Sequence, residues 1–252
     1  MKCKAMITAV AVVALVAAGG TGASAAESQN DLKSNLTTLS KAVPGSTEQQ
    51  TLTALTAQSK RTGEPVESIA ARAVQESIAA TNDARAIDRA SGVAAPYSSG
   101  GSTRKVSLGR ANNVGDVFYS SNSTFGVQHG HNGIYNTRDY YVEAVGIGQR
   151  TRVTSANSVT APAPAYKYFV GYNAPSGNKN AAGSFARSKV GTGYNIVFWD
   201  NKKVNDYVYN CSQLVWAAWK SRGIDLDANG GSGVYPADIA NSSWTKWYQT
   251  KY

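Results

Sequence analysis

The spacing of apolar residues differs between the two parts of the chain. In the first part, helical spacing predicts helices over 32–42, 48–59 and 65–76, the last with Ile69, Ala73 and Val74 on one face. Large apolar residues are scarce in these helices, so they can bury little surface by themselves. We therefore expect an α-helical N-terminal segment that does not build a large core of its own.

Beyond residue 104, apolar runs and alternating residues predict strands joined by polar turns. The expected strands are 114–119, 131–135, 140–144 and 166–172, the second and third forming a hairpin around residues 136–139. The expected helices are 180–190, 211–222 and a short one in or after 234–239. Asn210 can cap the helix at 211–222 and Gly223 can end it. This mixture predicts an α+β domain.

Residues 1–25 have the pattern of a secretory signal peptide. Lys2 and Lys4 precede an apolar run over 6–18, and Ala23-Ser24-Ala25 is a small-residue cleavage site. The apolar run is too short to span a bilayer comfortably. We therefore expect a secreted protein, extracellular or associated with the cell wall, without a transmembrane segment.

Composition divides the rest of the chain into residues 26–93, a linker over 94–104 rich in Ser and Gly, and a domain over 105–252. Eight basic and eight acidic residues lie in 26–104, against 15 and eight in 105–252. Every aromatic residue except Tyr97 lies beyond residue 104, so 105–252 is the part that can bury a core.

The positive charge of this domain suits an anionic cell-wall polymer as a partner, although it is equally consistent with solubility alone. Export makes nucleic acid a poor match. The sequence does not indicate the oligomeric state. Residues 26–93 have two open interpretations: a propeptide that covers a cleft until the linker is cut near Arg104-Lys105, or a helical spacer or assembly segment.

Candidate chemistry centres on a thiol. The chain has two cysteines, Cys3 in the leader and Cys211 at the start of the predicted helix 211–222. An unpaired thiol in an exported protein is open to oxidation, so its presence calls for a function. Lowering the pKa of a thiol by two units takes about 2.7 kcal/mol, whereas a helix N-terminus contributes ~0.3–1 kcal/mol. A histidine must supply the difference, and the only two are His129 and His131.

His131 is the better candidate for this histidine, because its predicted hairpin partner carries Glu143. A connecting loop of three or five residues would place His131 and Glu143 directly opposite each other, and a loop of four would place them on opposite faces. In the first case Glu143 accepts a hydrogen bond from one ring nitrogen, and the other nitrogen serves the thiol.

Each of these residues also has a purely structural interpretation. Cys211 can be a buried core residue, His131 a hydrogen-bonded strand residue, and Glu143 a carboxylate facing solvent. His129-Gly130-His131 also has the spacing of two zinc ligands, with Glu143, Asp116 or Cys211 completing the set. No HExxH or CxxC motif accompanies it, so we predict no metal and no cofactor.

Five short motifs occur in one order over residues 110–243. They are Gly115-Asp116-Val117, His131-Asn132-Gly133-Ile134-Tyr135, Val142-Glu143-Ala144, Cys211-Ser212-Gln213-Leu214-Val215 and Pro236-Ala237-Asp238-Ile239. In this content and order the domain resembles the permuted papain-like amidases, the YiiX-like branch of the NlpC-type cysteine hydrolases. The histidine strand precedes the cysteine helix in that branch, the reverse of the order in ordinary papain-like enzymes.

The resemblance implies a circularly permuted papain-like fold, with a small antiparallel barrel-like sheet packed on the cysteine helix. It implies Cys211 as nucleophile, His131 as base and Glu143 as the residue that orients the base. The implied activity is that of a secreted cysteine amidase or peptidase that cleaves cell-wall peptides or N-acyl amides through a thioacyl intermediate. A non-catalytic cell-wall-binding module and a thiol acyltransferase are the alternatives.

Two further residues are candidates for substrate contact. His129 has no matching position in the family and is expected at the rim of the site, and the Tyr209 hydroxyl is expected to point towards it. The sequence departs from the family pattern at Asn132, where a small apolar residue is usual, and in a long polar insertion between Glu143 and Tyr166. Because loops beside a site shape its specificity, neither departure lets the resemblance identify the substrate.

Overall fold

The computed structural model describes residues 21–43, 45–90, 104–124 and 127–252. Most of the predicted signal peptide, and all of the predicted linker except Arg104, therefore lie outside the described residues. The N-terminal segment consists of three helices, α1 (Thr21–Ala42), α2 (Glu48–Thr62) and α3 (Val66–Ala90). All three correspond to helices predicted from the spacing of apolar residues, and α3 runs 14 residues further than the predicted 65–76.

The domain is built on a six-stranded antiparallel sheet with the strand order β10-β9-β2-β5-β6-β7. Its strands are β10 (Thr245–Lys251), β9 (Ala165–Val170), β2 (Val117–Ser120), β5 (His131–Tyr135), β6 (Tyr140–Glu143) and β7 (Arg152–Ser155). Two small sheets pair β1 (Lys105–Ser107) with β8 (Val159–Pro162), and β3 (Ser123–Thr124) with β4 (Val127–Gln128). Within the described residues β10 and β7 are the edges of the main sheet, so it is open and does not close into a barrel.

Both faces of the sheet are buried. The helices α4 (Ser176–Ser188), α5 (Cys211–Lys220) and α6 (Pro236–Asn241) contribute to the core on one face, with α5 against β5 and α6 against β2. A second core on the other face includes residues of β1 and β8. Since side chains alternate along a strand, Val117 and Tyr119 belong to the first core and Phe118 to the second. This arrangement confirms the predicted α+β class.

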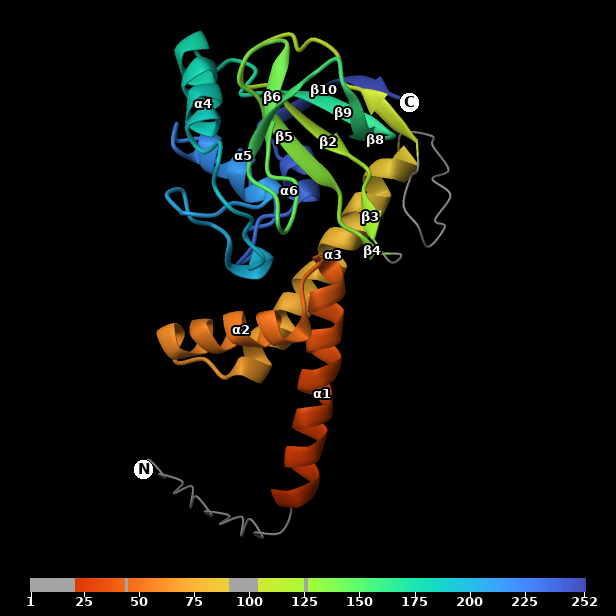
Figure 1. The fold of residues 1–252 in the computed structure, drawn as a ribbon, viewed down its shortest axis with the longest axis vertical. Coiled ribbons are helices and arrows are strands. Elements are labelled where there is room, and N and C mark those ends of the chain that lie inside the picture. Colours follow the sequence, from red (N-terminus) through yellow and green to blue (C-terminus); the bar gives the residue numbers. More distant parts are fainter. Residues whose placement is uncertain (1–20, 44, 91–103, 125–126) are drawn as a thin grey trace, which may run out of the picture.

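The N-terminal helices complete their own small core with a residue from the domain. Leu39, Leu55 and Ile69 are almost fully buried in a cluster with Trp199, which lies in the short 3-10 helix η1 (Phe198–Asp200). The indole nitrogen of Trp199 also donates to Gln58 at 2.9 Å. Figure 1 shows α3 running from α1 and α2 to the side of the sheet. The segment is therefore packed against the domain and is not a detached spacer.

Candidate active site

Cys211 is the first residue of α5, and the cap of this helix fixes its position. Asn210 is the N-cap, and its Oδ1 accepts a hydrogen bond from the backbone N–H of Gln213 at 2.9 Å. The Gln213 side chain in turn accepts one from the Asn210 backbone at 3.4 Å. This reciprocal capping box supports the start of the helix. Cys211 is 8% exposed, so its thiol lies at the inner end of a cleft.

His131 and Glu143 come from the neighbouring strands β5 and β6. The Nε2 atom of His131 lies 2.9 Å from Oε2 of Glu143. Tyr135 pairs with Tyr141 across residues 136–140, a register that sets Glu143 opposite Gly133. The two side chains thus share a face but are diagonal neighbours, whereas a five-residue loop was predicted to place them directly opposite. Diagonal residues are still within reach of long side chains.

His131 connects Glu143 to the thiol. Cys211 acts on the pKa of His131 through a hydrogen bond and through its charge, and because Nε2 contacts Glu143, Nδ1 is the ring nitrogen left to face the sulfur. Burial lowers the pKa of His131, but the hydrogen bonds and charges of Cys211 and Glu143 outweigh it and raise the pKa to about 10. Burial also raises the pKa of Cys211, but His131 and backbone N–H groups of Asn132 and Ser212 outweigh it, so this pKa is lowered. These shifts favour a thiolate–imidazolium pair.

Strand β7 holds the carboxylate of Glu143 in place. Arg152 donates to Oε1 of Glu143 from Nε at 3.1 Å and from Nη2 at 3.0 Å, and Thr154 donates to the same oxygen at 2.7 Å. Burial raises the pKa of Glu143, but hydrogen bonds from His131 and Thr154 and the charges of His131 and Arg152 lower it to about 2. Arg152 and Thr154 were missed because their strand lies in the stretch interpreted as a polar insertion. The available signal was the pair of β-branched residues Val153-Thr154, which favour a strand.

A glycine in β5 allows an aromatic ring to pack beside the histidine. A Cβ atom at Gly133 would lie 2.5 Å from the Phe118 ring, so only glycine fits there. Phe118 in turn contacts the ring of His131 edge-on, with the ring centroids 5.7 Å apart. The imidazole is thus fixed by packing as well as by its hydrogen bonds.

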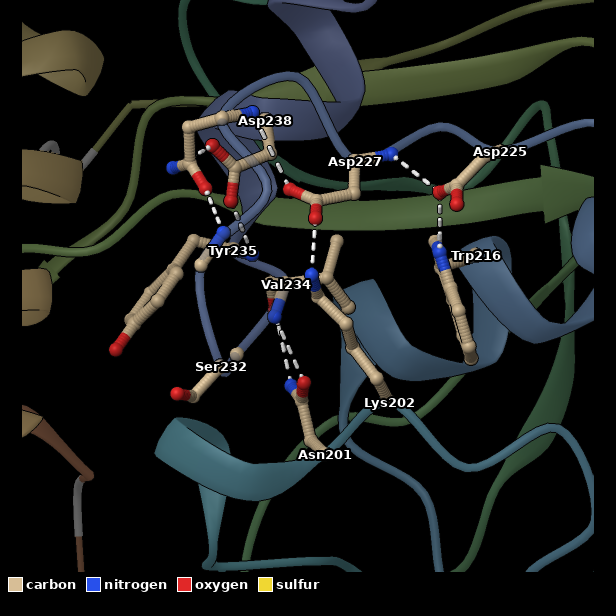
Figure 2. A network of polar contacts seen from close by, with 12 residues as sticks. Asn201, Lys202, Trp216, Asp225, Asp227, Ser232, Val234, Tyr235 and Asp238 are labelled. Atoms are coloured by element: carbon tan, nitrogen blue, oxygen red, sulfur yellow. Dashed lines mark hydrogen bonds and ion pairs between the residues drawn. The ribbon is translucent and has the colours of Figure 1, made fainter. Parts of the chain in front are cut away.

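A polar network behind the cysteine helix holds the segment before α6 in place. Figure 2 shows the side chain of Asn201 facing the backbone of Val234, from whose N–H it accepts at 2.8 Å and to whose carbonyl it donates at 2.9 Å. The hydroxyl of Ser212 donates to the same carbonyl at 2.7 Å. An ion pair between Lys202 and Asp227 supports the adjacent loop. This network connects the first turn of α5 to the segment that follows Val234. Two residues of that segment, Tyr235 and Pro236, line the same cavity as Cys211.

Cys211 and His131 line a cavity of about 100 Å³. The N-terminal helical segment contributes one side of it, through Ala42, Val43, Ser77, Ala80 and Thr81. The domain contributes the other sides, including His129, Tyr194, Asn210, Tyr235 and Pro236. Binding pockets for small molecules usually measure roughly 300–1,000 Å³, so the space at the thiol is small for a substrate.

The two candidates for substrate contact lie in different places. His129 lines the cavity, with its Nδ1 3.0 Å from the carbonyl oxygen of Gly130, and burial lowers its pKa to about 4. Tyr209 is fully buried, and its hydroxyl donates to the Val204 carbonyl and accepts from the Asp206 N–H. The Tyr209 hydroxyl therefore contacts a loop and does not line the cavity. Tyr194 does line it.

Two features of the described residues concern metal ions and membranes. Among the described residues, no three His, Cys, Asp or Glu side chains are grouped so that they could hold a metal ion. No helix within the same residues is both long and apolar enough to cross a membrane.

Comparison with known proteins gives two similarities. No family model matches the chain. The chain is 37% identical over 146 residues to YycO, an uncharacterized protein of Bacillus subtilis (strain 168), in a match that covers 55% of this chain and 56% of YycO. The chain thus spans about half the length of this relative. Among solved structures, yiiX from Escherichia coli O157:H7, described as a metalloprotein, matches with a TM-score of 0.42 and 13% identity, over 56% of this chain and 98% of that one.

The contact between Glu143 and His131 leads to a prediction for Glu143→Gln. Arg152 and Thr154 are donors, so they will hold the oxygen of the new amide, and its amino group will then face Nε2 of His131. Nε2 must become the acceptor, which leaves the proton on Nδ1, where it cannot accept one from the thiol. We expect kcat/KM to fall by about 10²-fold or more, with measurable turnover remaining. An unchanged pH–rate profile would contradict this role for Glu143.

Proposed function

We propose that this protein is a cysteine hydrolase that cleaves an amide bond, with Cys211 as nucleophile, His131 as base and Glu143 as the residue that orients His131. The observation that carries the proposal is the hydrogen-bonded chain from a helix-start thiol through a buried imidazole to a carboxylate fixed by two further side chains. In the proposal this is the papain-like arrangement in permuted order, since the histidine and the acid precede the cysteine in the chain.

The reaction follows from these positions. The Cys211 thiolate attacks the carbonyl carbon of the substrate and forms a tetrahedral oxyanion. His131 gives its proton to the leaving amine, and collapse of the intermediate leaves a thioacyl enzyme. His131 then takes a proton from water, whose oxygen attacks the thioester carbon. Collapse of this second tetrahedral intermediate expels the Cys211 thiolate, so the acid product leaves and the thiolate and protonated His131 are restored. Cys211 lies in the first turn of α5, where backbone N–H groups have no hydrogen-bond partner within the helix. Its N–H can therefore bind the oxyanion.

The proposed substrates are cell-wall peptides or N-acyl amides met outside the cell. This choice depends on the signal-like residues 1–25 and on the excess of basic residues in 105–252. Removal of a leader that carries Cys3 would leave Cys211 as a single thiol, which is easier to explain as a nucleophile than as half of a disulfide.

The test is a screen of the purified full chain against soluble cell-wall peptide fragments and N-acyl amino acids, with release of free amine as the readout. Hydrolysis of either class, together with a substrate-derived adduct on the peptide that contains Cys211, supports the proposal. Tight binding of cell-wall polymer with no amine release from any substrate would instead identify a binding module. Transfer of the acyl group to an added amine in preference to water would identify an acyltransferase.

A further inference from the structure

The side-chain amide of Asn210 has a fixed orientation. Its Oδ1 accepts from the backbone N–H of Gln213 at 2.9 Å and from Nδ2 of Asn201 at 3.3 Å. Both partners are donors, so the oxygen must face them and the amino group must face away. The helix cap thus determines where the Nδ2 atom points.

That amino group is buried without a partner. Asn210 is 3% exposed, and among the described residues its Nδ2 has no hydrogen-bond partner. A buried donor left unpaired destabilises the folded state, so its presence at this position calls for an explanation. Asn210 lines the same cavity as Cys211 and is its neighbour in the chain. The residue that carries the unpaired donor therefore borders the same cavity as the residue that carries the thiol.

The geometry points to Asn210 as a second oxyanion donor: its Nδ2 amino group, with the backbone N–H of Cys211, binds the oxygen that becomes negative when the thiolate attacks a carbonyl. This role rests on the proposed cysteine chemistry. Preorganised donors of this kind stabilise charge that develops only in the transition state. The same amide then has two tasks, because its oxygen caps α5 and its nitrogen contacts the substrate.

Two small electrophiles separate this role from a purely structural one. p-Nitrophenyl acetate acylates a thiolate through a tetrahedral oxyanion, whereas iodoacetamide alkylates the same thiolate by displacing iodide, with no oxyanion. Asn210→Ser removes the amino group and keeps a residue that caps helices well. With the full chain at a pH where the thiol is ionised, we expect acylation of Cys211 to slow by about 10²-fold. The rate of alkylation should differ from the wild-type rate by less than about threefold, because alkylation forms no oxyanion and depends on the thiolate alone.

Two further variants keep the result interpretable. Asn210→Asp has the same shape and also caps the helix, but places an oxygen where the amino group was, so acylation should again slow more than alkylation. Asn201→Ala disturbs the same network and leaves the Asn210 amide in place, so the ratio of the two rates should stay at the wild-type value.

Each outcome has a defined meaning. If Asn210→Ser slows both reactions equally, or neither, Asn210 is only a helix cap and the proposal is wrong. If the wild-type thiol reacts with p-nitrophenyl acetate no faster than free cysteine, both in the full chain and after removal of residues 1–103, the proposed hydrolase function fails and the oxyanion role fails with it. Fast acylation of the wild type with no loss in the variant would reject the Asn210 role alone.

Discussion

Cys211→Ala is expected to abolish hydrolysis, lowering kcat/KM by at least about 10⁴-fold, with the fold retained. The thiolate is the only group in the proposed reaction that forms a bond to the substrate. Removing one sulfur atom from the start of α5 should cost about 1 kcal/mol of stability. The hydrogen bond and the charge of Cys211 both raise the pKa of His131, so this pKa should fall in the variant. Turnover is measured by amine release and folding by thermal unfolding.

Cys211→Ser is the matched variant, because it keeps the size and shape of the side chain. A serine hydroxyl has a far higher pKa than a thiol, so the variant should be as inactive as the alanine one although its packing is preserved. Wild-type turnover in a folded Cys211→Ala protein would end the assignment of Cys211 as nucleophile.

Removal of the N-terminal helices is expected to raise activity on peptides. Ala42 and Val43 at the end of α1, and Ala80 in α3, line a cavity of only about 100 Å³ at the thiol. Glu76 of α3 accepts hydrogen bonds from the backbone N–H groups of Ser232 and Gly233 at 2.9 and 3.2 Å, next to the segment that lines the site. We propose that the segment limits access to Cys211. Deleting residues 1–103 should raise kcat/KM for peptide substrates by at least about tenfold.

A small electrophile provides the control. Iodoacetamide is small enough to need little opening of the cavity, so its rate with Cys211 should rise much less than the rate with a peptide. Glu76→Ala in the full chain weakens the docking of α3 without removing it and should show a smaller change in the same direction. If the shortened protein is folded and hydrolyses peptides no faster than the full chain, the helices form a permanent wall of the site.

Local patterns were enough to predict the elements that carry Cys211, His131 and Glu143, which the structure brings together. The cap signal at Asn210 identified the start of the cysteine helix, and alternation along residues 131–135 and 140–144 identified the hairpin that brings His131 to Glu143. Both signals come from interactions between residues that are close in sequence. The predicted pairing of the two strands was wrong: His131 and Glu143 are diagonal neighbours and do not lie directly opposite each other. The pairing depends on the conformation of residues 136–140, which the spacing of apolar residues does not predict.

The parts that were missed depend on contacts between distant segments. Strand β8 pairs with β1 more than 50 residues away, and β10 pairs with β9; neither stretch has strong alternation of its own. The packing of Trp199 against α1, α2 and α3 could not be predicted, because these helices contain few large apolar residues and gave no sign of a partner in the domain. The orientation of the Asn210 amide follows from two donors, the Gln213 N–H within the cap and Nδ2 of Asn201 from outside it.

The most direct test of the account is the rate of iodoacetamide alkylation at Cys211 as a function of pH, in the wild type and in His131→Ala. Peptide mass spectrometry separates Cys211 from Cys3. The lowered pKa of Cys211 and the raised pKa of His131, about 10, imply an ion pair that forms as the thiol loses its proton and is lost as pH rises through 10. The account predicts a wild-type midpoint well below 8.5 that rises when His131 is removed. A midpoint at the ordinary value for a thiol, unchanged in His131→Ala, would contradict it.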